Sequence, residues 1–319
     1  MNSHPAETPW GALSVYDAHV HFFSHRYFSM LAAQRSGGPE QKTIEAAGAA
    51  LGWEMPPEAP EQLAGRWVQE LDRYGIARAV LIASLPGDED SVAAAVAAYP
   101  KRFYGYFMVN PCAPDVRAGV EKTLAAGLLQ GICLFPAMHR YSIRDPRVQP
   151  LLELLSDRPG SVVFVHCGVL TVGVREKLGI PSEFDLNFSN PLDVHTAAAR
   201  FPKVNFVIPH LGAGFFREAL MVCDLCPNVH LDTSSSNRWV RYLEGDMNLR
   251  RVFKRALEVA GPRRLLFGTD SSHFPRGWQR PVFESQARIF YELGVAEADA
   301  RAIFGENLDR LLARKSSKA

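Results

Sequence analysis

Val15-Tyr16-Asp17-Ala18-His19-Val20-His21 is the stretch of this sequence from which the fold can be inferred. It continues an apolar run that begins at Ala12 and is typical of a short buried strand. Side chains alternate between the two faces of a strand, so a regular strand places Asp17, His19 and His21 on one face. Two imidazoles at this spacing can reach one metal ion, and imidazole nitrogen suits zinc, copper, iron and nickel. The motif alone fits a polar, solvated strand face equally well, so the choice between this interpretation and a metal site depends on the rest of the sequence.

After this strand the sequence alternates between helical patterns and short apolar runs. Apolar strands separated by helices are typical of a parallel sheet covered on both faces, and eight of them predict a closed (β/α)₈ TIM barrel. A doubly wound open sheet is the alternative, but no Gly-x-Gly-x-x-Gly follows the first strand, so its nucleotide-binding form has no support. The seven later strands are expected at 77–83, 103–109, 131–135, 162–166, 204–208, 229–232 and 264–268.

Residues 24–60 show no strong periodicity apart from a short helical pattern near 41–51. A connection of this length inside a compact domain is usually functional or mobile, so we expect a lid after the first strand. Helical patterns at 281–293 and 297–312 predict an extra helix after the barrel, and the tail 315–319 is expected to fray. Residues 1–319 are therefore expected to form one barrel domain.

The composition is that of an ordinary soluble globular protein, with 47% hydrophobic and 22% charged residues. Lys plus Arg number 35 and Asp plus Glu 34, so the net charge of +1 gives no electrostatic case for nucleic acid or an acidic membrane surface. No run resembles a signal peptide or a membrane span, which favours a cytoplasmic protein. The five cysteines lack a disulfide-like spacing and are expected to be reduced, with Cys167 a candidate for lining a cavity.

The first, fifth, sixth and eighth predicted strands each carry a histidine or an aspartate at or just after the C-terminal end. Because the C-terminal ends of all strands in a parallel barrel lie on one face, where the active site is built, these side chains are expected to converge there. Together they favour a metal site over the polar-strand interpretation. The residues concerned are Asp17, His19 and His21 in the first strand, His166 after the fifth, His210 after the sixth and Asp270 after the eighth.

Coordination chemistry suggests a role for each of these residues. A catalytic zinc-type site takes three or four protein ligands and keeps one position open, so His19, His21, His166 and Asp270 form the expected ligand set. Asp270 can also take a proton from a metal-bound water, and His210 can orient that water or polarise a substrate oxygen. Asp17 is expected to orient the ligands or to act as a weak extra ligand.

The chain resembles the amidohydrolase superfamily over about 15–312, in Asp17-x-His19-x-His21, His166, His210-Leu211-Gly212 and Phe267-Gly268-Thr269-Asp270. The most similar branch is the amidohydrolase-related group that includes aminocarboxymuconate semialdehyde decarboxylase. The resemblance implies one divalent metal, usually Zn²⁺ with Mn²⁺ or Fe²⁺ as alternatives, and a homodimer. Binuclear members carry a lysine at the end of the fourth strand, and 131–136 has none, which favours a mononuclear site. Several decarboxylases of the branch carry a glutamate where this chain has Asp17, so both hydrolase and decarboxylase remain open.

The expected function is a metal-dependent hydrolase acting on a small carboxylated or cyclic organic molecule. The alternative is a metal-dependent decarboxylase or hydratase acting on a carboxylated aromatic or muconate-like compound, and a barrel with a purely structural metal is a third hypothesis. A guanidinium is well shaped for a carboxylate, and aromatic rings can form an apolar wall. The expected substrate-binding residues are His273, Arg140, Arg217, Arg238 and Trp53, with His139 and Arg276 as further candidates.

Overall fold

A computed structural model describes residues 5–235 and 237–313, and its central feature is a barrel of eight parallel strands. Each strand pairs with the next along the chain, in the order expected when a helix returns the chain after every strand. The prediction of eight alternating β and α units is confirmed. The strands are β3 Val15–His21, β4 Ile76–Ala83, β5 Phe103–Val109, β6 Gly131–Leu134, β7 Val162–Val165, β8 Asn205–Ile208, β9 Val229–Asp232 and β10 Leu265–Leu266.

The barrel closes between its first strand and the segment that follows β10. Val20 forms a parallel bridge with Ser271, and the His21 amide donates to the Ser271 carbonyl at 2.8 Å. The Ala18 amide donates to the Phe267 carbonyl at 2.9 Å. This seam brings the C-terminal end of β3 beside residues 267–271, so the two ends of the barrel sequence meet where polar residues cluster.

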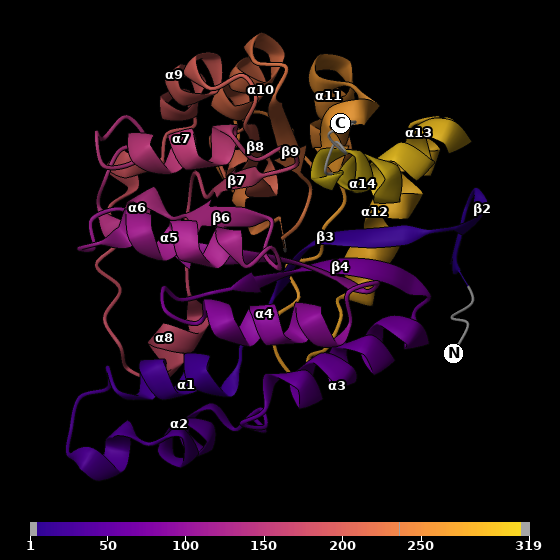
Figure 1. Cartoon of the computed structure of the whole chain (residues 1–319). Helices are drawn as coiled ribbons and strands as arrows, with labels where there is room; N and C mark the ends of the chain where they lie inside the picture. Colours follow the sequence, from indigo (N-terminus) through magenta and orange to yellow (C-terminus); the bar gives the residue numbers. More distant parts are fainter. Residues whose placement is uncertain (1–4, 236, 314–319) are drawn as a thin grey trace, which may run out of the picture.

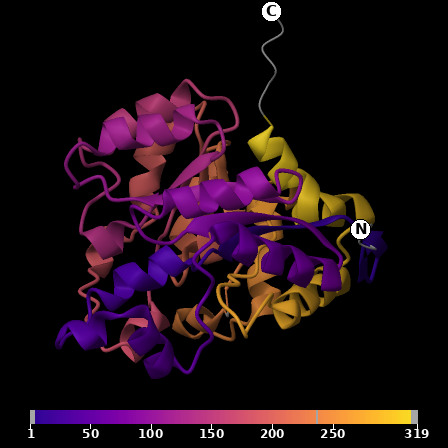
Figure 2. The same ribbon diagram turned by 60° about the horizontal axis from the view of Figure 1, so that its bottom comes forward.

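Helices form the outer layer around the strands (Figure 2). α3, for example, buries an apolar stripe of Leu63, Trp67 and Leu71 in the core. The helices that follow the strands are α3 Pro60–Arg73, α4 Glu89–Ala98, α5 Val116–Ala125, α6 Pro136–His139, α7 Gln149–Ser156, α9 Leu192–Arg200, α10 Phe216–Leu225, α11 Leu249–Ala260 and α12 Arg280–Glu292. The chain continues into α13 Glu297–Arg301, a π-helical turn Ala302–Glu306 and α14 Asn307–Leu312, which provide the extra helical segment predicted after the barrel.

Two apolar layers fill the molecule. The barrel interior packs Ala18, Val80, Tyr106 and Phe164, and Leu308 of α14 contributes to the same cluster. The second layer lies between strands and helices. The interior is therefore a packed core, and ligands are confined to the barrel mouth.

The regular alternation predicted for the first strand is wrong at one position. The pairing of β3 with β4 shifts register between Asp17 and Val20, a β-bulge-type irregularity that breaks the two-residue period. Ala18 packs into the barrel interior, whereas the Asp17 carboxylate accepts a hydrogen bond from the indole of Trp278 in the outer layer. Asp17 therefore does not share the face of His19 and His21.

The segment between β3 and α3 holds α1 His25–Ala32, a 3₁₀ turn Pro39–Lys42 and α2 Ile44–Leu51, the helix predicted near 41–51. It packs against α8 Gly173–Lys177, which follows β7 and was not predicted. Figure 1 shows α1, α2 and α8 gathered at one end of the molecule. Phe28 and Leu31 of α1, Ala47 of α2 and Val174 of α8 form a small apolar cluster of their own.

The short antiparallel hairpin β1 Ala6–Thr8 and β2 Gly11–Leu13 was also not predicted, and the tail 315–319 lies outside the described residues. No described helix is both long and apolar enough to cross a membrane. All five cysteines are free, and Cys167 packs in the layer between strands and helices.

Candidate metal centre and active site

A cavity of about 360 Å³ opens at the C-terminal ends of the strands. Side chains from several strand ends reach it, as the barrel topology predicts. They include His21 from β3, Ser84 after β4, His166 after β7, His210 after β8 and Asp270 after β10. The volume is at the small end of the range of about 300–1,000 Å³ for ligand pockets, so the cavity suits a small organic molecule.

Three side chains at the strand ends, those of His19, His21 and Asp270, converge on one point. Nε2 of His19 lies 3.2 Å from Nε2 of His21, and Oδ1 of Asp270 lies 3.3 Å from His21 Nε2 and 3.7 Å from His19 Nε2. Ligand atoms about 2.0–2.2 Å from a tetrahedral metal stand about 3.3–3.6 Å apart. Two imidazole nitrogens and one carboxylate oxygen at these separations fit a divalent metal ion.

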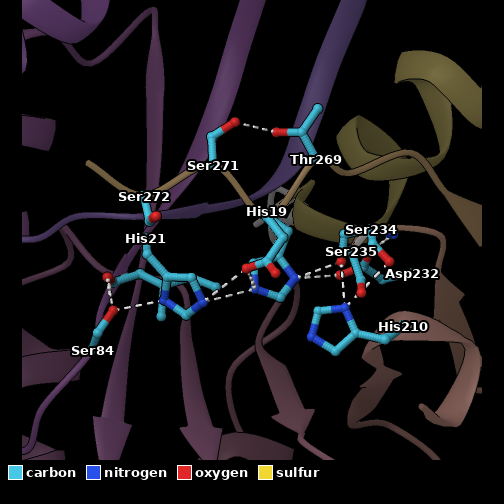
Figure 3. A network of polar contacts seen from close by, with 12 residues as sticks. His19, His21, Ser84, His210, Asp232, Ser234, Ser235, Thr269, Ser271 and Ser272 are labelled. Atoms are coloured by element: carbon cyan, nitrogen blue, oxygen red, sulfur yellow. Dashed lines mark hydrogen bonds and ion pairs between the residues drawn. The ribbon is translucent and has the colours of Figure 1, made fainter. Parts of the chain in front are cut away.

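The opposite nitrogen of each ring is held by hydrogen bonds (Figure 3). His19 Nδ1 donates to the Asp232 carboxylate at 2.7 Å, and Ser234 Oγ lies 2.9 Å from the same nitrogen. His21 Nδ1 lies 2.7 Å from Ser84 Oγ, which itself donates to the Ile82 carbonyl and so is left to accept from the ring. With the proton on Nδ1 in both rings, each Nε2 presents a lone pair to the shared point.

The local charges set the protonation states of the group. Burial lowers the pKa of His21 and lowers that of His166 well below its usual value. For His19 burial is outweighed by the Asp232 carboxylate, so its pKa is raised. Burial acts to raise the pKa of Asp270, but the adjacent rings of His21, His19 and His210 outweigh burial and hold the pKa well below its usual range. Asp270 is therefore an ionised oxygen donor at neutral pH, as a metal ligand must be.

Strained backbone aims two of the side chains. Asp270 and His210 have φ of 60° and 54°, in the left-handed region that non-glycine residues adopt uncommonly. The Asp270 amide donates to the His19 carbonyl at 3.0 Å, which ties the carboxylate to the strand of its partners. Gly268 leaves room for this arrangement, because a Cβ there would lie 2.9 Å from Asp232 Oδ1 and 3.0 Å from the His19 Cβ.

His166 and His210 lie beside this trio on the same cavity. The His210 ring centroid is 5.0 Å from that of His19 and 5.3 Å from that of His166. Ser234 Oγ lies 2.9 Å from His210 Nδ1 and thus bridges His210 and His19. The ligand atoms of His19, His21 and Asp270 all lie within 4.8 Å of one another, and His166 is not part of this group. Nδ1 of His166 is buried with no hydrogen-bond partner among the described residues. A buried ring nitrogen without a partner is the kind of group that a bound ligand or ion satisfies.

Asp17 contacts both sides of the barrel seam. Its carboxylate is buried and accepts hydrogen bonds from the His19 amide at 2.9 Å, the Thr269 amide at 3.1 Å and Trp278 Nε1 at 2.7 Å. Burial raises its pKa to about 6. Asp17 is not among the residues lining the cavity. Its contacts hold His19 and the residue before Asp270 in place.

The candidate substrate-binding residues divide into two groups. His273 and Trp53 line the cavity, and their rings stack with centroids 3.7 Å apart. The structure does not bring Arg140, Arg217 or Arg238 to the cavity. Arg140 pairs with Glu183, Arg217 pairs with its neighbour Glu218, and Arg238 is exposed on the 3₁₀ turn Arg238–Tyr242. The basic side chains that do line the cavity are Arg175, Lys177 and Arg276.

The hydrogen-bonding partners of the two histidines were not identified from the sequence. Asp232 ends β9, as His21 ends β3, and the rule that directed attention to the other strand ends applies to it equally. Ser234 and Ser84 follow strands in the same way, but serines are common in loops, and their spacing gives no signal of a partner more than sixty residues away.

Comparison with known proteins gives one family. The family model described as Amidohydrolase matches residues 16–314. A curated relative, protein fluG of Emericella nidulans, is 27% identical over 158 residues, which are 48% of this chain and 17% of that protein. The chain therefore spans about a sixth of the length of that relative.

Solved structures share the fold at low sequence identity. An uncharacterised TIM-barrel protein from Bordetella bronchiseptica has a TM-score of 0.63 and 20% identity, covering 93% of this chain and 98% of that one. A 5-carboxyvanillate decarboxylase from Novosphingobium aromaticivorans, solved with manganese and 3-methoxy-4-hydroxy-5-nitrobenzoic acid, has a TM-score of 0.63 and 14% identity, covering 97% and 99%. A probable 2-pyrone-4,6-dicarboxylic acid hydrolase from Acinetobacter baumannii, solved with citric acid, has a TM-score of 0.57 and 13% identity, covering 94% and 99%.

Proposed function

This chain belongs to the amidohydrolase family, and on that premise we propose that it is a metal-dependent hydrolase of a small carboxylated or cyclic organic molecule. The observation that carries the proposal is the convergence of His19 Nε2, His21 Nε2 and Asp270 Oδ1 at separations of 3.2 to 3.7 Å beside an open cavity. We propose one divalent ion, Zn²⁺ first with Mn²⁺ or Fe²⁺ as alternatives, held by these residues together with His166. A bound ion of this kind supplies Lewis acidity and makes water a stronger nucleophile at neutral pH.

The protein's own residues then have distinct tasks. Asp270 is ionised, its side chain is 33% exposed, and its free carboxylate oxygen is the base that takes a proton from the attacking water. Burial lowers the pKa of His210, so its neutral ring can donate one hydrogen bond toward a substrate oxygen while Ser234 fixes the ring's orientation. Asp232, Ser84 and Asp17 position the ligands.

Support for the substrate class comes from the cavity walls. The Trp53–His273 stack, Phe135 and Met138 give a surface suited to a flat, partly apolar molecule. Two structural neighbours carry small organic acids, citric acid in one and a nitrobenzoic acid in the other.

A second candidate is a non-oxidative decarboxylase or hydratase using the same metal. The observation favouring it is the apolar wall formed by Met108, Phe135, Met138 and Leu170. A substrate carboxylate pressed against such a wall loses solvation, which lowers the cost of leaving as CO₂. The decarboxylase among the neighbours supports the same candidate.

The test combines metal analysis with isotope labelling. Purified protein should hold close to one equivalent of divalent metal, and turnover of lactones and carboxylated aromatics in H₂¹⁸O should place ¹⁸O in the product. CO₂ release without label would reject the hydrolase in favour of the decarboxylase. If chelators remove the metal only when the protein unfolds, and the protein acts on no substrate tested, both the hydrolase and the decarboxylase proposals would be rejected.

Two variants test the site itself. His166→Ala and Asp270→Ala should lose metal and turn over at least about 100-fold more slowly. Arg217→Gln, an exposed residue paired with Glu218, is the matched control and should behave as the wild type. Full metal occupancy in both alanine variants would contradict the ligand assignment.

A further inference from the structure

Three basic side chains line the active-site cavity. Arg175 and Lys177 belong to α8, and Arg276 lies in the loop after β10. Asp270 is the single acidic residue among the described residues that line the cavity, and it faces the histidines. Away from those histidines the lining is therefore positively charged.

These cations lack acidic partners, in contrast to many arginines on the described surface. Arg280 pairs with Glu284 at 2.6 Å, and Arg66 pairs with Glu54 at 2.8 Å. Arg175 donates instead to the amide oxygen of Gln34 and to the Pro181 carbonyl, and its Nε is buried without a hydrogen-bond partner. Within 5–235 and 237–313, neither Lys177 nor Arg276 forms an ion pair or side-chain hydrogen bond.

Two of the cations lie around one aromatic pair. Lys177 Nζ stands 5.1 Å from the centroid of the Trp53 ring, which stacks on His273 at 3.7 Å. Arg276 lies three residues after His273, in a turn where the Gly277 amide donates to the His273 carbonyl at 2.9 Å, and it lines the same cavity. Burial and then the charges of Arg276 and Lys177 lower the pKa of His273 to about 4. Trp53, Lys177 and His273 come from three separate segments of the chain, so packing between these segments holds the cations at the cavity.

We propose that Lys177 and Arg276 form an anion subsite, backed by Arg175, that binds a carboxylate or phosphate of the substrate distant from the reacting centre. The inference rests on the proposed function and gives the substrate class as small dianions. One polar group of the substrate lies at the histidines and Asp270, and an anionic group lies beside Trp53 and His273. Charges gathered in a cleft attract ions of opposite sign, and unpaired Lys and Arg side chains are free to give charge-assisted hydrogen bonds to a ligand. Neighbouring arginines already paired with carboxylates cannot do this without losing a partner.

The experiment compares two probes that differ in one charge. Benzene-1,3-dicarboxylate carries two carboxylates, and 3-carbamoylbenzoate has the same shape with one carboxylate replaced by an amide. Calorimetric titration of wild-type, metal-loaded protein should show about tenfold tighter binding of the dicarboxylate, and this preference should shrink as salt is added. A parallel titration with 3-phosphonobenzoate shows whether the subsite prefers phosphonate or carboxylate.

Three variants locate the preference. Lys177→Gln with Arg276→Gln should bind both probes with nearly equal affinity, and Arg276→Gln alone should lose part of the preference without disturbing a described side-chain contact. Arg217→Gln should retain the wild-type preference. A double variant that is folded and still prefers the dicarboxylate about tenfold would overturn the subsite.

Metal content measured on the same samples separates the two proposals. Wild-type protein that prefers the dicarboxylate but binds no divalent metal would reject the proposed function and leave the subsite standing. Normal metal content with no preference between the probes in the wild type would reject the subsite alone.

Discussion

Replacing Asp232 with asparagine tests how the histidine pair is prepared for metal. In the wild type, Oδ2 accepts from His19 Nδ1 at 2.7 Å and Oδ1 accepts from the Ser234 amide at 2.6 Å, and the side chain is fully buried. Asparagine offers one acceptor and one donor group for these two positions. If its oxygen faces His19, two donors meet at the Ser234 amide. If its NH₂ faces His19, the ring must carry its proton on Nε2, the atom that points at His21 and Asp270.

Each outcome has a cost of known order. A buried donor left without an acceptor costs about 1–3 kcal/mol of folding free energy. A reversed tautomer must be corrected before metal binds, and loss of such a partner typically weakens metal binding about 10- to 100-fold, or about 1.4–2.8 kcal/mol. We therefore expect Asp232→Asn to bind divalent metal at least about tenfold more weakly while keeping its fold.

Metal affinity is measured by competition with a chromophoric chelator, and the fold by circular dichroism and denaturant unfolding. Asp193→Asn is the matched control, because each oxygen of Asp193 likewise has one partner, Ser142 Oγ or Arg144 Nε, but Asp193 belongs to α9. It should retain wild-type metal affinity. Wild-type affinity in a folded Asp232→Asn protein would refute the assignment of His19 Nε2 as a ligand atom.

Three further predictions use other features. Gly268→Ala should place a methyl group against Asp232 and His19 and lower metal affinity and activity about tenfold or more, whereas Gly119→Ala, in open space on α5, should be neutral. Burial raises the pKa of Asp88 to about 6 from 3.8, so the folded state holds its proton more tightly. The stabilisation this gives is present below about pH 4 and is lost as pH rises through about 6, by at most about 3 kcal/mol. Denaturant unfolding between pH 4 and 7 should show this loss in the wild type relative to Asp88→Asn, and parallel curves for the two proteins would contradict it. Chelation should lower the melting temperature, with recovery on adding Zn²⁺ or Mn²⁺, and a variant carrying both His19→Ala and His21→Ala should show no such shift.

The fold followed from local patterns in the sequence. β5 is a nearly continuous apolar run, and the bounds of β5 and β9 agree with those expected. The hairpin β1–β2 and the five-residue α8 are too short to show a hydrophobic period in the sequence. The shifted register in β3 depends on pairing with β4, so no pattern within Val15–His21 predicts where Asp17 points.

The site was predictable to the extent that strand ends determine it. His19, His21 and Asp270 converge because closing a barrel brings their strands together, and Asp232 could have been found by the same rule. The basic residues at the cavity follow no such rule. The direction of a loop arginine depends on its local partners, and Arg140, for example, is held by its ion pair with Glu183. Lys177 reaches the cavity because α8 packs against α1 and α2.

Closure of the barrel has a consequence for synthesis of the protein. The hydrogen bonds between Asp17 and Thr269 join residues 252 positions apart, and the candidate metal group straddles the same seam. At about 5–20 residues per second a ribosome needs about 13–50 s to make that intervening chain. Throughout this time β3 has an unpaired edge, and His19 and His21 are without Asp270. A nascent chain stopped before Thr269 carries the histidines but lacks Asp270, so the candidate metal group is complete only after the last barrel strand has been made.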